Sequence, residues 1–175
     1  ELSNLALAHM RVSQIAASLS DNASRISIDV GLPVPQVRES DVNELLAAAL
    51  KQGESIDLET HGKVILSSLE QNGSSEQWIH WQRCAGDKLF PSSYGNEGTQ
   101  GGLFDGMGDT GKRIAAPPGA AVMFVEISYD YQPIAYGSWL GPKTMRYTSS
   151  FLVRDDRDLA QIYNPSPSAA VATCV

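Results

Sequence analysis

The sequence predicts an α+β fold in which two helices precede an antiparallel sheet of about four strands. Apolar residues recur with a helical period at the start of the chain, whereas from Lys63 onward they alternate with a period of two. The strands therefore follow the helices in series. That order favours an antiparallel sheet, because parallel strands need a crossover helix between each pair.

The first predicted helix covers residues 1–28 and has a narrow, alanine-rich apolar stripe. Two rows with a spacing of seven form the stripe: Leu5, Val12, Leu19 and Ile26, and, three positions before each, Leu2, His9, Ala16 and Ala23. The stripe fits an ordinary helix that faces a core, or the soluble half of a longer helix whose upstream half lies in a membrane. No capping residue precedes Glu1, so we expect that an upstream segment has been removed.

Gly31 to Pro35 ends this helix, because proline cannot continue it. A second helix is predicted from Asp41, where Asp41 and Glu44 have the spacing of a capping box, to Gly53 in the C′ position. We expect residues 1–30 to form the N-terminal helix and residues 31–175 an α+β head, together one domain.

Four segments have strand character: residues 63–69, 77–84, 120–131 and 144–154. Asn72-Gly73 is a strong turn signal between the first two. In the third strand Val122, Phe124 and Glu126 share one face, and we expect the Glu126 carboxylate on the solvent side. The acidic cluster at residues 155–158 is interpreted as surface charge.

Residues 85–118 are a long, glycine-rich loop. Asp105 and Asp109 lie four residues apart among glycines and are the candidates for a metal site, with calcium as the one cofactor considered. The EF-hand pattern is absent, so the favoured interpretation is a solvated loop without a cofactor. With few apolar anchors, residues 95–111 are expected to order poorly unless they are pinned.

The formal net charge of −7 argues against nucleic acid as a partner. No catalytic motif is present, and the sequence predicts a protein that is not an enzyme. Ser67 and Ser68 lack the G-x-S-x-G context, although a triad that uses His61 or His80 stays open because triads assemble in space.

Cys84 and Cys174 do not form a C-x-x-C pair. In a polar, serine-rich chain they fit one disulfide formed in an oxidising compartment, the alternative being two unrelated free thiols. The bond would close a loop of 174 − 84 = 90 residues and hold the C-terminal tail across the sheet.

The segments Val64–Leu69, Trp78–Cys84 and Val125–Ile134 resemble the ectodomain of TadE-like proteins, the minor pilins or pseudopilins of tight adherence (Tad/Flp) pili. Phe151–Tyr163 fits the same pattern. The resemblance extends over roughly residues 60–163, with the glycine-rich loop as a variable insert.

The resemblance implies a pilin-like fold, no catalytic residues, and a structural or assembly role in a pilus. It also implies a location in the periplasm or at the cell surface, with a membrane anchor upstream of this chain. Other pilins or Tad components would pack on Leu2, Leu5, His9 and Val12. Leu2 and Leu5 are therefore expected to be exposed, whereas Leu19 to Ile26 pack on the sheet.

The competing hypothesis is a secreted hydrolase or a calcium-stabilised extracellular binding domain, with residues 95–114 as its site loop. A hydrolase would bring His61 or His80 within hydrogen-bonding distance of a nucleophile and a carboxylate.

Overall fold

The computed structural model describes residues 1–26, 34–133, 143–154 and 156–174. The helical elements are α1 (Leu2–Arg25), α2 (Glu39–Gln52), the 3-10 turn η1 (Glu54–Ile56) and α3 (Leu58–His61). The strands are β1 (Gly62–Gln71), β2 (Gln77–Ala85), β3 (Val122–Asp130) and β4 (Thr144–Leu152). The predicted α+β order is confirmed; η1 and α3 were not predicted. Helix α1 ends at Arg25, before the predicted end at residue 28, because Ile26 already has an extended backbone. Residues 27–28 and most of the predicted break lie outside the described residues.

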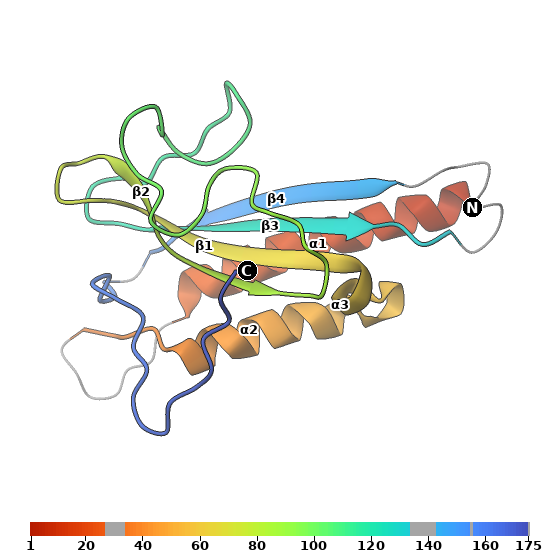
Figure 1. Cartoon of the computed structure of the whole chain (residues 1–175), viewed down its shortest axis with the longest axis horizontal. Helices are drawn as coiled ribbons and strands as arrows, with labels where there is room; N and C mark the ends of the chain where they lie inside the picture. Colours follow the sequence, from red (N-terminus) through yellow and green to blue (C-terminus); the bar gives the residue numbers. More distant parts are fainter. Residues whose placement is uncertain (27–33, 134–142, 155, 175) are drawn as a thin grey trace.

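The four strands form one antiparallel sheet in the order β2-β1-β3-β4. The Asn72 side chain accepts hydrogen bonds from the backbone of Ser74 (2.9 Å) and Glu76 (3.0 Å), which fixes the tight β1–β2 connection. In Figure 1, α1 crosses behind β3 and β4 while α2 runs below it, and the loop after β2 lies over the front of the sheet. The sheet is therefore covered on both faces.

Alternate residues of β3 supply two separate cores, as the period of two predicts. Met123, Val125 and Ile127 belong to the large core under α1 and α2. Val122 and Phe124 belong to a smaller core under the glycine-rich loop. The prediction that Glu126 lies on the solvent side is wrong: it is only 6% exposed, because the loop covers this face too.

Helix α1 changes from exposed to buried along its length. Leu19 is buried, and Ile26 packs against the core, as expected. Leu2 is 68% exposed, which also agrees with the prediction. Leu5 is partly buried against the core, so its predicted exposure is wrong. None of the described helices is both long enough and apolar enough to cross a membrane.

Helix α2 begins two residues before the predicted start, with Arg38 as its N-cap residue. Asp41 is the third helical residue, and its carboxylate accepts a hydrogen bond from the Arg38 backbone N–H (3.0 Å). The earlier start places Glu39 beside Arg83 of β2, and their side chains form a buried ion pair of 2.6 Å. Gly53 follows the last residue of α2 as its C-cap residue, one position earlier than the predicted C′.

The glycine-rich loop is pinned to the sheet through several contacts, which is the condition under which residues 95–111 were expected to be ordered. Met107 is fully buried in the smaller core, where Phe104 and Ile114 pack against it. Met107 and Ile114 also exchange backbone hydrogen bonds of 3.0 and 2.8 Å. At the outer edge of β2, Ile79 exchanges backbone bonds with Gly98 and Thr99.

The C-terminal tail wraps around the start of α2 and ends at β2, as Figure 1 shows. Tyr163 exchanges backbone hydrogen bonds with Val37 and Glu39. Cys84 and Cys174 form the predicted disulfide, with sulfur atoms 1.98 Å apart. The Cys84 backbone N–H also donates to Ala172 (2.8 Å). The tail is thus strapped to the edge strand of the sheet.

The cluster at residues 155–158 is only partly surface charge, which corrects the prediction. Asp155 lies outside the described residues, and Asp156 is exposed. Arg157 is buried, and its guanidinium donates to the backbone carbonyls of Ala23 (3.1 Å) and Ser24 (2.5 Å) at the end of α1. A buried arginine at this position caps a helix C-terminus, where unpaired carbonyls accumulate partial negative charge.

Candidate functional site: a groove beside the N-terminal half of α1

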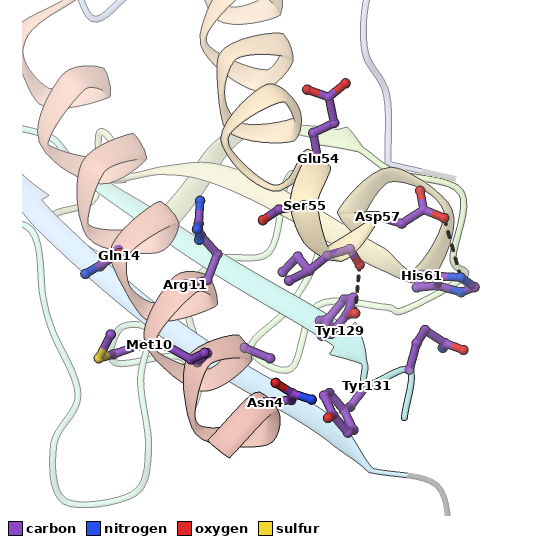
Figure 2. A pocket seen from close by; sticks show the side chains of 14 residues that line it. Asn4, Met10, Arg11, Gln14, Glu54, Ser55, Asp57, His61, Tyr129 and Tyr131 are labelled. Atoms are coloured by element: carbon purple, nitrogen blue, oxygen red, sulfur yellow. Dashed lines mark hydrogen bonds and ion pairs between the residues drawn. The ribbon is translucent and has the colours of Figure 1, made fainter. Parts of the chain in front are cut away.

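An open groove of about 590 Å³ runs between α1, the η1–α3 segment and the end of β3. Figure 2 shows α1 on one side with Asn4, Arg11 and Gln14, and Tyr129 and Tyr131 of the sheet between α1 and the opposite wall. Glu54, Ser55, Asp57 and His61 form that opposite wall. The groove is therefore lined by three segments that are distant in the chain.

Tyr129 near the end of β3 and Tyr131 just after it form the floor. Tyr129 is 2% exposed and donates a hydrogen bond through Oη to the Ile56 carbonyl (2.7 Å), which holds η1 on the sheet. Tyr131 donates to the Glu1 carboxylate (2.6 Å) and so anchors the first residue of the described chain. Burial and the Glu1 carboxylate raise the pKa of Tyr131 to about 12, so this phenol stays protonated at neutral pH.

The rim on the α1 side is apolar. Leu7 is 58% exposed and Met10 is 56% exposed, although both are large apolar residues on the same helix. They lie three residues apart and therefore on one face of α1. Adjacent exposed apolar side chains at the edge of a groove are typical of a surface that packs against another protein.

The opposite wall is acidic and solvated. Glu54 pairs with Lys51 (2.6 Å), and Asp57 lies 3.5 Å from Nε2 of His61. Arg11 is exposed on the α1 side, and no ion pair involves it within the described residues. The groove thus offers an apolar ridge flanked by charges of both signs, which suits a partner protein better than a small apolar ligand.

The four predicted partner contacts on α1 do not form one exposed surface. Leu2 is exposed, but Leu5 is partly buried against the core. Nδ1 of His9 lies 2.9 Å from Oη of Tyr147 in β4. Val12 is fully buried against the sheet of this chain, so its assignment to a partner is wrong. The seven-residue stripe faces the protein's own core, and a neighbouring face presents Leu7 and Met10 instead.

The loop aspartates are not brought together around a common site. Asp105 forms an ion pair with Arg113, and Asp109 accepts a hydrogen bond from Oη of Tyr94 (3.1 Å). Among the residues the structure describes, no group of three His, Cys, Asp or Glu side chains could hold a metal ion. Each of the two carboxylates therefore has a partner within the loop.

His80 meets a carboxylate, but not in the order that a hydrolase uses. Nδ1 of His80 lies 2.9 Å from Glu70, and Ser68 donates to the other oxygen of Glu70 (2.6 Å). The carboxylate stands between serine and histidine, whereas a triad needs histidine between the other two. The indole of Trp78 stacks on the imidazole with ring centroids 4.0 Å apart. This arrangement orients His80 without activating Ser68.

Only part of the groove has a signal in the sequence. Tyr129 and Tyr131 lie on the face of their strand opposite Glu126, so the period of two places them on the same side as Val125, in the large core. The seven-residue pattern separates Val12, which lies on the apolar stripe, from Leu7, which does not, but it leaves open whether the stripe packs on this protein's own core or on a partner. The wall at η1 and α3 was missed because these elements are too short to show a period.

The chain matches no family model, no curated protein and no solved structure.

Proposed function

We propose that this chain is a structural or assembly component of a bacterial pilus of the Tad/Flp type, similar to the TadE-like minor pilins. Its role would be to pack on neighbouring subunits through the N-terminal half of α1 and the adjacent groove. In this proposal the protein works in the periplasm or at the cell surface, is anchored in the inner membrane, and catalyses no reaction.

The observation that carries the proposal is the change of environment along α1. Its 24 residues span about 36 Å. From Ala8 onward one face of the helix is buried, while Leu2, Leu7 and Met10 remain exposed in the N-terminal half. Leaving large apolar side chains in water costs free energy that a helix partner would recover.

The groove gives this surface a shape that a helix can enter. Small and polar side chains of α1, Asn4 and Ala8, line it beside the apolar rim. The floor is rigid, because Tyr129 and Tyr131 are hydrogen-bonded to η1 and to Glu1. An amphipathic helix that buries Leu7 and Met10 would also bring its polar face close to Arg11 and Glu54.

The test is complementation with a charged α1 surface. In a strain that lacks the chromosomal copy of this gene, the full-length protein with Leu7→Asp and Met10→Asp is expected to leave few or no pili on electron micrographs. Two aspartates at a helix–helix contact would have to be buried without partners. Immunoblots should show the variant at the wild-type level, since both positions are already exposed.

The matched control introduces the same charge elsewhere on the same helix, with Ser13→Asp and Asn22→Asp, both at exposed positions. This variant should restore wild-type piliation. Normal piliation by the Leu7/Met10 variant would refute the proposed surface, and normal piliation in the deletion strain would refute the proposed function.

A further inference from the structure

A second pocket lies on the opposite face of the sheet from α1 and has a different chemistry. It has a volume of about 520 Å³ and is open to solvent between β3, β4 and the glycine-rich loop. Its floor comes from Glu126 and Ser128 of β3 and from Arg146 and Thr148 of β4. In the strand register Glu126 is opposite Thr148, and Ser128 is opposite Arg146.

The pocket exists because the loop face of the sheet changes character along β3. Val122 and Phe124 are apolar, and Met107 of the loop covers them. The next two positions on this face, Glu126 and Ser128, are polar. The apolar anchors of the loop end there, and polar loop residues line the remaining space: Ser93, Tyr94, Asp109, Thr110 and Arg113.

Both carboxylates of the pocket are held by neighbours within the protein. Glu126 accepts hydrogen bonds from Oγ of Ser92 (2.6 Å) and from the backbone N–H of Ser93 (2.9 Å), so it fixes the wall to the floor. Asp109 accepts the hydrogen bond from Tyr94. Neither carboxylate forms an ion pair with Arg146 in the described residues.

The guanidinium of Arg146 forms no direct ion pair among the described residues, although its charge acts on Glu126 in the same floor. Its Nη1 donates to Oγ of Ser93 (3.2 Å), and within the described part of the chain no carboxylate lies within ion-pair distance of it. Arg113 adds a second guanidinium at the wall, paired with the exposed Asp105. A planar guanidinium binds a carboxylate through two parallel hydrogen bonds.

The hydroxyl groups around this charge narrow the class of ligand. Ser93, Thr110, Ser128 and Thr148 can each donate and accept hydrogen bonds. Large polyanions are disfavoured, because the whole chain has a net charge of −7 and repels them. A small ligand with several hydroxyls can bond to these side chains, and with only one negative charge it is not strongly repelled by the acidic protein.

We propose that this pocket binds an acidic sugar, a hexuronate whose carboxylate pairs with Arg146 and whose hydroxyls bond to the serine and threonine side chains. The inference does not depend on the proposed packing of α1, since the two sites lie on opposite faces of the sheet. The pocket would then be a recognition site for a glycan that ends in a single uronic acid.

The test is titration of the ¹⁵N-labelled protein, with its disulfide intact, with glucuronate, glucose and acetate, followed by NMR. Glucuronate is expected to shift the amide signals of Ser93, Ser128 and Thr148 in a saturable way. Glucose lacks the carboxylate and acetate lacks the hydroxyls, so each should bind at least about tenfold more weakly. Raising the salt concentration should weaken glucuronate binding, because the site is open to solvent.

Arg146→Met should lower the affinity for glucuronate at least about tenfold. Arg154→Met, an exposed arginine outside the pocket, should leave it unchanged. If Arg146→Met does not fold, Arg146→Lys gives the same comparison, because it keeps the charge and removes the planar guanidinium that binds a carboxylate through two hydrogen bonds. Absence of saturable shifts with glucuronate, equal binding of acetate or glucose, or wild-type affinity in the pocket variant that folds would overturn the proposal.

Discussion

Glu126, Arg83 and Arg157 are charged side chains inside the protein, and each joins segments that are distant in the chain. Glu126 holds the glycine-rich loop on β3 through Ser92 and Ser93. Arg83 joins β2 to Glu39 of α2, and the neighbouring carboxylates raise the pKa of its guanidinium, so it remains charged. Burying a charge costs free energy, so such groups are stable only where hydrogen bonds replace water.

Glu126 should make the free energy of unfolding depend on pH. Burial raises the pKa of its carboxyl above the usual value, while Ser92, Ser93 and Arg146 oppose this only in part. Its contribution to stability is therefore fully present below the ordinary glutamate pKa and is lost as the pH rises through the raised value. Glu126→Gln removes the charge and keeps one accepting oxygen, while its amide NH2 group can donate to the Ser92 hydroxyl in place of the second accepted bond. In urea unfolding, the free energy of unfolding of the Glu126→Gln variant minus that of the wild type should increase from pH 4 to pH 7.

A difference that stays constant over this pH range, or that decreases with pH, would contradict this account of Glu126. Asp109 and Tyr94 line the same pocket, and burial raises the pKa of Tyr94 to about 12, so its phenol does not titrate in this range.

Arg157 should be one of the most sensitive positions in the C-terminal tail. Arg157→Met removes two buried hydrogen bonds to the last carbonyls of α1 and should lower the free energy of unfolding by about 2–3 kcal/mol. The control is Arg154→Met, at an exposed position three residues away. This substitution should change the free energy of unfolding by less than about 0.5 kcal/mol. Chemical denaturation of both variants measures this, and equal effects would argue against a capping role.

Among the elements, the glycine-rich loop depends most on backbone conformation. It folds back on itself where Met107 and Ile114 pair, and Gly106 precedes this contact with a φ of 129°. A Cβ atom at Gly106 would lie 2.2 Å from the Ile114 carbonyl oxygen. At Gly111, which has a φ of 82°, a Cβ atom would meet no atom within 4 Å.

These two glycines form a matched pair of substitutions. Gly111→Ala should cost about 1 kcal/mol from the positive φ alone. Gly106→Ala adds a steric clash with the backbone and should cost about 3 kcal/mol, with loss of the polar pocket. Differential scanning calorimetry compares the two. Similar melting temperatures for both variants would show that the Met107–Ile114 contact does not hold the loop.

At the scale of the whole molecule, the disulfide closes the fold by joining its last residues to an edge strand. The tail between β4 and Cys174 has polar and proline residues and only a few apolar side chains on the core, among them Leu159 and Ile162. Without a covalent tether, such a tail would fray. The same bond, with the loop at Gly98–Thr99, covers the outer edge of β2 and limits pairing with other strands.

Replacing both cysteines, Cys84→Ser with Cys174→Ser, should lower the free energy of unfolding by as much as about 4–5 kcal/mol, because the bond closes a loop of 90 residues. Limited proteolysis should then cleave the tail after Tyr163. Intact-mass measurement should find no alkylatable thiol in the native wild type and two after reduction. Reductant should not affect the serine variant. Equal stability of oxidised and reduced wild type would contradict a structural role for the bond.

The sequence alone determined the order of helices and strands, the two faces of each strand and the disulfide. The change of period at Lys63 separates helices from strands, and the alternation in β3 assigns Val125 and Phe124 to opposite faces. The end of α2 at Gly53 and the pairing of the only two cysteines could also be predicted. These features depend on neighbours in the chain or on composition, which a sequence displays directly.

The tertiary structure alone decided which surfaces are covered. Glu126 was predicted at the surface and is buried, because the distant loop folds over its face of the sheet. Val12 is buried and Leu7 exposed, because the sheet lies under only one face of α1. Periodicity identifies the face on which a residue lies, whereas burial depends on what packs against that face. That packing is determined by strand order and by contacts between segments distant in the chain, such as Arg157 with Ala23.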